Sequence, residues 1–305
     1  MYSRHETAEP LSEQRIARQR INAAGHVASK RRFPDDDSVS GMGHHPHTGR
    51  ESALAQLDQQ GSARIRLPNS AKGPLQAVLI NTAGGLTGND DIRWSATAGK
   101  QSRLVVSTAA CEKLYRTHGP AALQRTRLAV ENGARLDWLP QETIVFDGSS
   151  LQRSLEVDVA SDATALIVES LVLGRQAMHE SVGKLQLHDR WRIHRDGRLL
   201  HAEDLRLQFD NAQNAQRPSM LHQYSAISTL VLVSPDPAES LHLKAEGIRA
   251  LLSEQAGSLQ AAATVMHHRL VIRVLANNSQ SLRNFLIPCI EQLSDHLSIP
   301  QVWNV

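Results

Sequence analysis

The fold of this chain is decided by residues 184–209, which read KLQLHDRWRIHRDGRLLHAEDLRLQF. Apolar and polar residues alternate on both sides of Asp196-Gly197, a dipeptide that supplies the positive φ angles of a tight hairpin turn. Side chains two residues apart share one face of a strand, so this stretch predicts two antiparallel strands. The same period of two recurs upstream, which indicates a mainly β protein.

Further strands are predicted between about residues 73 and 210, where short alternating runs are bounded by turn residues. These runs are Leu75–Thr82, Ile92–Thr97, Leu104–Thr108, Leu123–Val130, Ala134–Leu139 and the segment with Leu151, Arg153, Leu155, Val157 and Val159 on one side. Asn132-Gly133 predicts another hairpin turn. The pattern favours many short antiparallel strands in a β-helical or stacked-sheet scaffold.

A few helices are expected toward the C-terminal end. Pro237–Ser253 and Ser279–Leu297 carry apolar residues at spacings of three and four, and Ser279 is a candidate N-cap. Thr229–Ser234 and Ala262–Leu275 resemble strands beside them. The apolar stripe of the second helix must pack on the β core or on a partner protein; its members are Leu282, Phe285, Leu286, Ile290 and Leu293.

Composition excludes several classes of protein. The 305 residues include 41% hydrophobic residues, enough for a sizeable core, and the net charge of +2 predicts no basic face for nucleic acid. No apolar run is long enough to cross a bilayer. The two cysteines, Cys111 and Cys289, lack metal-binding or redox spacing. We therefore expect a soluble cytoplasmic protein without nucleic-acid or membrane partners.

Residues 1–52 differ from the rest of the chain, because their apolar residues are sparse and follow no period. We expect a disordered tail there and one β-rich domain over residues 53–305. His44, His45 and His47 in this tail could bind a divalent metal, but weakly, because the segment is expected to be flexible.

Charged residues interrupt faces that are otherwise apolar. Asp189 interrupts the apolar face of the first strand in residues 184–209, and His201 and Glu203 interrupt that of the returning strand. Glu169 lies inside the apolar run at residues 166–173. Burying a carboxylate without partners is costly, so these groups should have hydrogen-bond partners or reach internal water. Two interpretations stay open: a satisfied polar network that orders the core, or a hydrated acidic passage for a cation.

The glycine-rich segment at residues 79–91 follows a strand, so a phosphate-binding loop has to be considered. The residues after it alternate like a strand, and Asp90 and Asp91 would repel a phosphate. A structural turn between strands is favoured. The chain also lacks a Gly-x-Ser-x-Gly elbow and a His-Glu-x-x-His helix, which are signatures of hydrolases.

Three segments resemble signatures of the UreD (UreD/UreH) family of urease accessory proteins: Gly84–Asp90, Thr108–Arg116 and Leu136–Asp147, with Glu169, Gly174-Arg175 and Glu180 following in order. The resemblance covers about residues 73–210, with a weaker echo at residues 300–303 and none in the tail. Asn89 departs from the glycine usual in the family, although asparagine tolerates a left-handed conformation.

The resemblance implies a non-enzymatic scaffold that binds apo-urease and, through a UreF-type accessory protein, recruits a UreG-type GTPase. Ni²⁺ would then be cargo in transit, with no tightly bound cofactor. Six carboxylates are candidates for a transient nickel passage: Glu142, Asp147, Glu169, Glu180, Asp189 and Glu203. The stripe of the last helix would form part of the UreF contact. The alternative is a β-sandwich carbohydrate-active enzyme or binding module that uses Glu142 and Asp147 as paired carboxylates.

Overall fold

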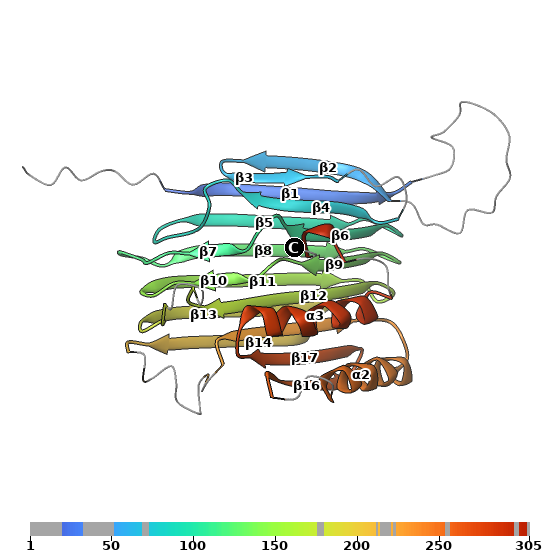
Figure 1. The fold of residues 1–305 in the computed structure, drawn as a ribbon. Coiled ribbons are helices and arrows are strands. Elements are labelled where there is room, and N and C mark those ends of the chain that lie inside the picture. Colours follow the sequence, from blue (N-terminus) through green and yellow to red (C-terminus); the bar gives the residue numbers. More distant parts are fainter. Residues whose placement is uncertain are drawn as a thin grey trace, which may run out of the picture.

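The computed structural model describes residues 20–32, 52–68, 73–175, 180–211, 213, 221, 224–253, 257–295 and 299–303. Its strands form two facing sheets, and within each sheet the strands lie one above another roughly in chain order, with two helices and a short 3₁₀ helix on one side (Figure 1). The expectation of a mainly β scaffold with stacked sheets and helices near the C-terminal end is confirmed.

The first sheet has seven strands in the order β14-β13-β11-β8-β5-β1-β2. Along most of these strands, buried and exposed residues alternate, so one face turns inward and the other meets solvent. The strands are β1 (Asn22–Arg31), β2 (Ser52–Gln60), β5 (Asp91–Ala98), β8 (Ala122–Val130), β11 (Ser149–Val159), β13 (Leu185–Arg195) and β14 (Arg198–Phe209).

The second sheet has ten strands, and eight of them lie in the order β16-β17-β15-β12-β9-β6-β4-β3. The short strands β7 and β10 pair with each other beside β12. The members are β3 (Ala63–Arg66), β4 (Leu75–Asn81), β6 (Arg103–Thr108), β7 (Glu112–Leu114), β9 (Arg135–Leu139), β10 (Thr143–Val145), β12 (Thr164–Leu173), β15 (Ala226–Val233), β16 (Leu259–Met266) and β17 (Arg269–Ala276).

The middle of the molecule is a β-solenoid of parallel strands, and the expectation of antiparallel strands is wrong there. The chain passes from β5 to β6, from β8 to β9 and from β11 to β12, changing sheets each time. Successive coils therefore stack in parallel, as in the pairs β5–β8, β8–β11, β6–β9 and β9–β12. Antiparallel pairing is confined to the ends of the stack, for example β1–β2 and β13–β14. Period two alone does not distinguish the two arrangements.

The two predicted hairpin turns have different outcomes. Asp196-Gly197 joins the antiparallel strands β13 and β14, and both residues have positive φ (47° and 73°). Gly133 also has positive φ (64°), but Asn132-Gly133 leads from β8 in one sheet to β9 in the other, so it makes no hairpin. The expected strand over Ala262–Leu275 is two strands, β16 and β17, which turn at residues 267–268.

The prediction of a disordered tail over residues 1–52 is wrong for residues 22–31. These residues form β1, which lies between β2 and β5 and pairs with both along its length. Ala23 and Val27 are buried in the core. Small residues such as alanine and glycine carry little periodic signal, so the sequence pattern does not reveal this strand. His44, His45 and His47 lie outside the described residues.

Two apolar cores hold the elements together. One fills the space between the sheets, and the other lies between the second sheet and the helices α2 (Ala238–Ser253) and α3 (Ser279–Leu293). Asn278 caps α3 instead of Ser279, since its side chain accepts from the backbone N–H of Ser281. All five stripe residues of α3 are fully buried in the second core. Core packing, rather than a partner, therefore covers this stripe.

Within the part of the chain that the structure describes, no helix is long and apolar enough to cross a membrane.

Candidate functional site

The three signature segments meet at one end of the solenoid coils. Leu86 forms a bridge with Leu114, and the backbone N–H of Phe146 donates to the carbonyl of Leu114 at 3.0 Å. The N–H of Glu112 donates to the carbonyl of Glu142 at 3.1 Å. Segments separated by up to sixty residues thus become neighbours because each belongs to a successive coil.

The glycine-rich segment is a turn between β4 and β5, and the prediction of a structural turn is confirmed. Gly85 has φ of 150°, and a Cβ there would lie 2.6 Å from the carbonyl oxygen of Lys113, so no larger residue fits. Asn89 takes the left-handed conformation expected of it (φ 67°). The carboxylate of Asp90 accepts from the N–H groups of Thr87 and Ile21. One backbone amide of this turn, that of Thr87, thus binds a carboxylate of the chain itself.

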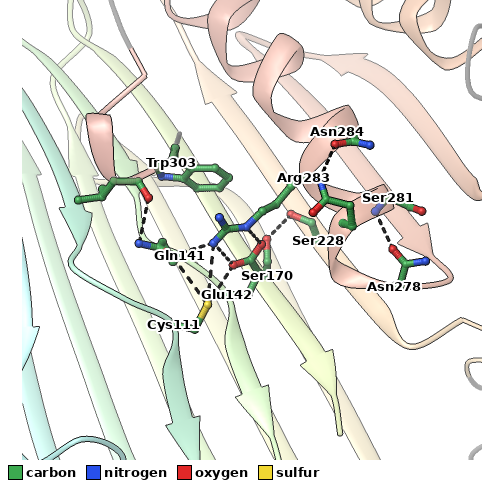
Figure 2. A network of polar contacts seen from close by, with 12 residues as sticks. Cys111, Gln141, Glu142, Ser170, Ser228, Asn278, Ser281, Arg283, Asn284 and Trp303 are labelled. Carbon is green, nitrogen blue, oxygen red and sulfur yellow. Dashed lines mark hydrogen bonds and ion pairs between the residues drawn. The ribbon is translucent and has the colours of Figure 1, made fainter. Parts of the chain in front are cut away.

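Glu142 belongs to a network that fastens α3 to the second sheet (Figure 2). Its carboxylate receives two hydrogen bonds from Arg283, at 2.8 and 2.9 Å, and one from the thiol of Cys111 at 3.3 Å. Burial raises the pKa of Glu142, but the hydrogen bonds and charge of Arg283 outweigh burial and leave it below the ordinary value. Gln141 links Arg283 to the 3₁₀ helix η3 (Gln301–Trp303) by donating to the carbonyl of Val302.

The thiol of Cys111 is held in its neutral form by this network. Burial and the negative charge of Glu142 raise its pKa to about 11, against the opposing effect of Arg283. A thiol with such a pKa is protonated at pH 7 and is a poor nucleophile and metal ligand. Cys111 therefore serves here as a hydrogen-bond donor.

Asp147 and Glu180 lie together beside Phe146. Asp147 pairs with Arg116 at 2.5 Å and also accepts from the backbone N–H groups of Gly183 and Lys184. Glu180 pairs with Arg175 at 2.8 Å and accepts from the N–H of Asp147. Both carboxylates thus order the loops at this end of the solenoid.

Glu169 and Asp189 form the deepest charged cluster, because both contact Arg153. The terminal guanidinium nitrogens of Arg153 each lie 2.5 Å from a carboxylate oxygen, Nη1 from that of Glu169 and Nη2 from that of Asp189. Trp138 Nε1 donates to Glu169 at 2.9 Å, and Trp191 Nε1 donates to Asp189 at 3.1 Å. All three charged side chains are at most 5% exposed. The expectation that these carboxylates have hydrogen-bond partners is confirmed.

Glu203 lies apart from the other five candidates. It pairs with Arg273 of β17 at 2.5 Å, and its carboxylate is 3.6 Å from His201 Nε2. Each of the six carboxylates therefore has an arginine partner, and they occupy four separate places. Glu142 and Asp147, the pair that the enzyme alternative requires, have different arginine partners.

A cavity of about 150 Å³ opens between the sheets, and Glu169 is the only one of the six candidates in its wall. The polar residues in this wall that the sequence did not single out as candidates include Glu112 of β7 and Gln124 of β8. Burial raises the pKa of Glu112 to about 7, although Asn81 donates to its carboxylate. The side-chain oxygen of Gln124 is buried and has no hydrogen-bond partner among the described residues. Glu112 could have been noticed, because it lies inside the second signature segment.

The cavity wall carries residues of both charge signs, because Lys113 lines it together with Glu112 and Glu169. Carboxylate and amide oxygens line it together with the apolar rings of Trp94 and Trp138. Nowhere in the described parts of the chain do three or more His, Cys, Asp or Glu side chains group closely enough to hold a metal ion.

These features define a class: a two-sheet β-solenoid scaffold with a helical cover, a carboxylate-bearing cavity and signature loops gathered at one end. The UreD urease accessory protein family matches residues 42–304. The chain therefore belongs to the UreD family of urease accessory proteins.

The chain also aligns with individual relatives over most of its length. The chain is 46% identical to the urease accessory protein UreD of Chelativorans sp. (strain BNC1) over 252 residues, which are 83% of this chain and 88% of the relative. It is 40% identical to UreD of Agrobacterium fabrum over 294 residues, 96% of this chain and 95% of the relative. The UreD of Sinorhizobium medicae is also 40% identical, over 93% of this chain and all of the relative. These relatives support a urease accessory role.

Proposed function

We propose that this protein is a scaffold for urease maturation that binds apo-urease and presents it to a UreF-type protein and a UreG-type GTPase in the cytoplasm. Ni²⁺ would be the cargo of that assembly and would be in transit only. Membership of the UreD family over residues 42–304 is the observation that carries this proposal. The free cysteines Cys111 and Cys289 are compatible with a reducing compartment.

The nickel passage is proposed for the interior pair first. Glu169 lines the cavity and shares Arg153 with Asp189. The charge of a cation that enters between the sheets would therefore act on both carboxylates. Glu142, Asp147, Glu180 and Glu203 remain predicted contributors, each held by an arginine nearer the periphery. A cation would have to compete with these arginines at every step.

The helical cover is proposed as the UreF contact, through its outer face. The buried stripe of α3 is excluded from this role because it packs on the second sheet. Leu243 of α2 is 73% exposed, the largest exposure of any large apolar residue described. An exposed leucine on a firmly packed helix is a suitable contact for an apolar partner surface.

Co-expression tests the proposal. The chain should co-purify with UreF-type and UreG-type proteins and with apo-urease, and Leu243→Asp should weaken recovery of the UreF-type protein while thermal unfolding is unchanged. His242→Asp, one position along α2, is the matched control for added charge. Absence of association with all three partners would contradict the scaffold role, and normal UreF recovery with Leu243→Asp would remove only the proposed contact.

A further inference from the structure

The strand β16 forms one edge of the second sheet, next to α2 (Figure 1). It pairs with β17 on one side, and no strand in the described part of the chain pairs with its other side. Its sequence, LQAAATVM, contains neither a charged residue nor a proline. Natural proteins usually protect a sheet edge with such residues, because the free backbone groups of an edge strand pair readily with another strand. The strand β16 itself carries no protection of this kind.

The other three sheet edges carry charged side chains. They are Asp58 on β2, Arg64 and Arg66 on β3, and Arg198, Glu203, Asp204 and Arg206 on β14. When two copies of one strand pair about a two-fold axis, a residue near the middle of the strand lies opposite itself. In β14 this residue is Glu203 or Asp204, so two carboxylates would face each other. In contrast, β16 can pair with a second copy without any charged side chain in the contact.

The hydrogen bonds of β16 show which of its backbone groups face the free edge. The N–H of Asn277 donates to the carbonyl of Ser258 at 3.1 Å, and the register of β16 on β17 continues from this pair. Hydrogen-bonded and non-bonded pairs alternate along an antiparallel ladder. The backbone groups of Ser258 and of every second residue after it therefore point toward β17. The groups that point outward belong to Leu259, Ala261, Ala263 and Val265.

One of these outward groups has a partner on α2. Arg249 Nη2 donates to the carbonyl of Ala263 at 2.7 Å, which agrees with the outward direction of that carbonyl. Arg249 Nη1 donates to Glu246 at 2.6 Å. The side chain of Arg249 is 45% exposed, so water can replace Ala263 as its acceptor. Arg249 therefore covers the middle of the edge with a contact that can be broken.

We propose that the free edge of β16 pairs with the same edge of a second copy of this chain, and that Arg249 weakens this pairing by occupying the carbonyl of Ala263. The second sheets of the two copies then join into one continuous sheet. Association stops at the dimer, because a two-fold contact uses the same edge of both copies and β14 repels its own copy. This interface goes beyond the proposed function and requires no urease partner.

The geometry of the pairing follows from the outward groups. A two-fold axis at Ala262 places this residue opposite itself. Leu259 then lies opposite Val265, and Ala261 lies opposite Ala263. In this register each outward N–H of one copy meets an outward C=O of the other. The carbonyl of Ala263 takes part, so Arg249 must release it in both copies.

Sedimentation velocity of the purified full chain over a range of concentrations measures this association. The wild type should form a dimer as the concentration rises, and no larger species. Arg249→Ala should lower the dissociation constant of the dimer at least about tenfold, because two hydrogen bonds to Ala263 no longer have to be broken. Thermal unfolding establishes that each variant is folded.

Ala262 allows a test by exchange of charge, because it is exposed and a polar side chain there leaves the fold of each copy intact. Ala262→Asp and Ala262→Lys should each stay monomeric, since like charges then face each other across the axis, whereas a mixture of the two should dimerise. Ala202→Asp, at an exposed alanine of the edge strand β14, is the matched control and should dimerise like the wild type. A wild type and an Arg249→Ala variant that both stay monomeric up to the limit of solubility would overturn the proposal. So would an Ala262→Asp variant that dimerises as tightly as the wild type.

Discussion

Removal of Arg283 should destabilise the protein strongly, because it leaves a buried carboxylate without its cation. The side chain of Glu142 is 2% exposed and that of Arg283 is 15% exposed, so water replaces the lost partner poorly. Breaking a buried ion pair from one side costs about 3–5 kcal/mol. We expect Arg283→Met to lower the free energy of unfolding by about 3 kcal/mol, near the lower end of this range, because the arginine side of the pair reaches solvent.

Thermal and urea unfolding followed by circular dichroism measure this loss. Since 1 kcal/mol lowers the Tm of a large domain by about 2–4 °C, Arg283→Met should lower it by about 6–12 °C. Combining it with Glu142→Gln removes the unpaired charge and should recover most of the loss. Arg127→Met breaks an exposed pair, with side chains 80% and 49% exposed, and should cost less than about 1 kcal/mol.

The pH dependence of this loss has a defined sign. The pKa of Glu142 lies below its ordinary value in the folded wild type. The stability that this pair provides is present above the unfolded-state pKa of about 4.3 and is lost as pH falls through the lower folded-state pKa. The difference between wild type and Arg283→Met should therefore shrink in acid. An equal cost for Arg283→Met and Arg127→Met at pH 7 would refute the reasoning.

Three other predictions follow from local geometry. Gly85→Ala should lower the free energy of unfolding by more than about 1 kcal/mol beyond the loss from Gly84→Ala. Both residues have positive φ, but only at Gly85 would a Cβ collide with a backbone atom. Urea unfolding compares the two variants, and equal losses would contradict the clash. Deleting residues 1–32 removes β1 and should abolish cooperative unfolding, whereas deleting residues 1–19 keeps β1; similar melting curves would show that β1 is dispensable. The raised pKa of Glu112, about 7, means that its contribution to stability is present below about pH 4.3 and lost as pH rises through 7. Glu112→Gln should therefore reduce the loss of Tm between pH 6 and pH 8, and an unchanged loss would assign it to other groups.

The strands could be predicted from the sequence because alternation is a local signal. Leu123–Val130 and β8, for example, differ by a single residue at one end. The direction of pairing could not be predicted, because parallel coils and antiparallel hairpins give the same alternation in strands with one buried face. β1 was missed because its alanines, glycine and serine carry little contrast between buried and exposed positions.

The candidate site was predicted in part. Glu169 and Asp189 stood out because a carboxylate in an apolar face is unusual, and the structure places both in the interior beside Arg153. Arg153 is likewise a charged residue in the apolar face of its own strand. The sequence does not show, however, which charges face one another across two sheets. Gln124 joins the group only through the register of β8 and β11, which depends on the length of each coil.

The most direct test of the central proposal is urease activation in a host that carries a urease gene cluster without its own UreD gene. Co-expression of this chain should restore urease activity and stoichiometric nickel in urease. Glu169→Gln should lower both, while the variant still folds and still co-purifies with its partners; Glu156→Gln, on the exposed face, should not. Urease that stays inactive and free of nickel, although the wild-type chain is present in soluble form, would contradict the account.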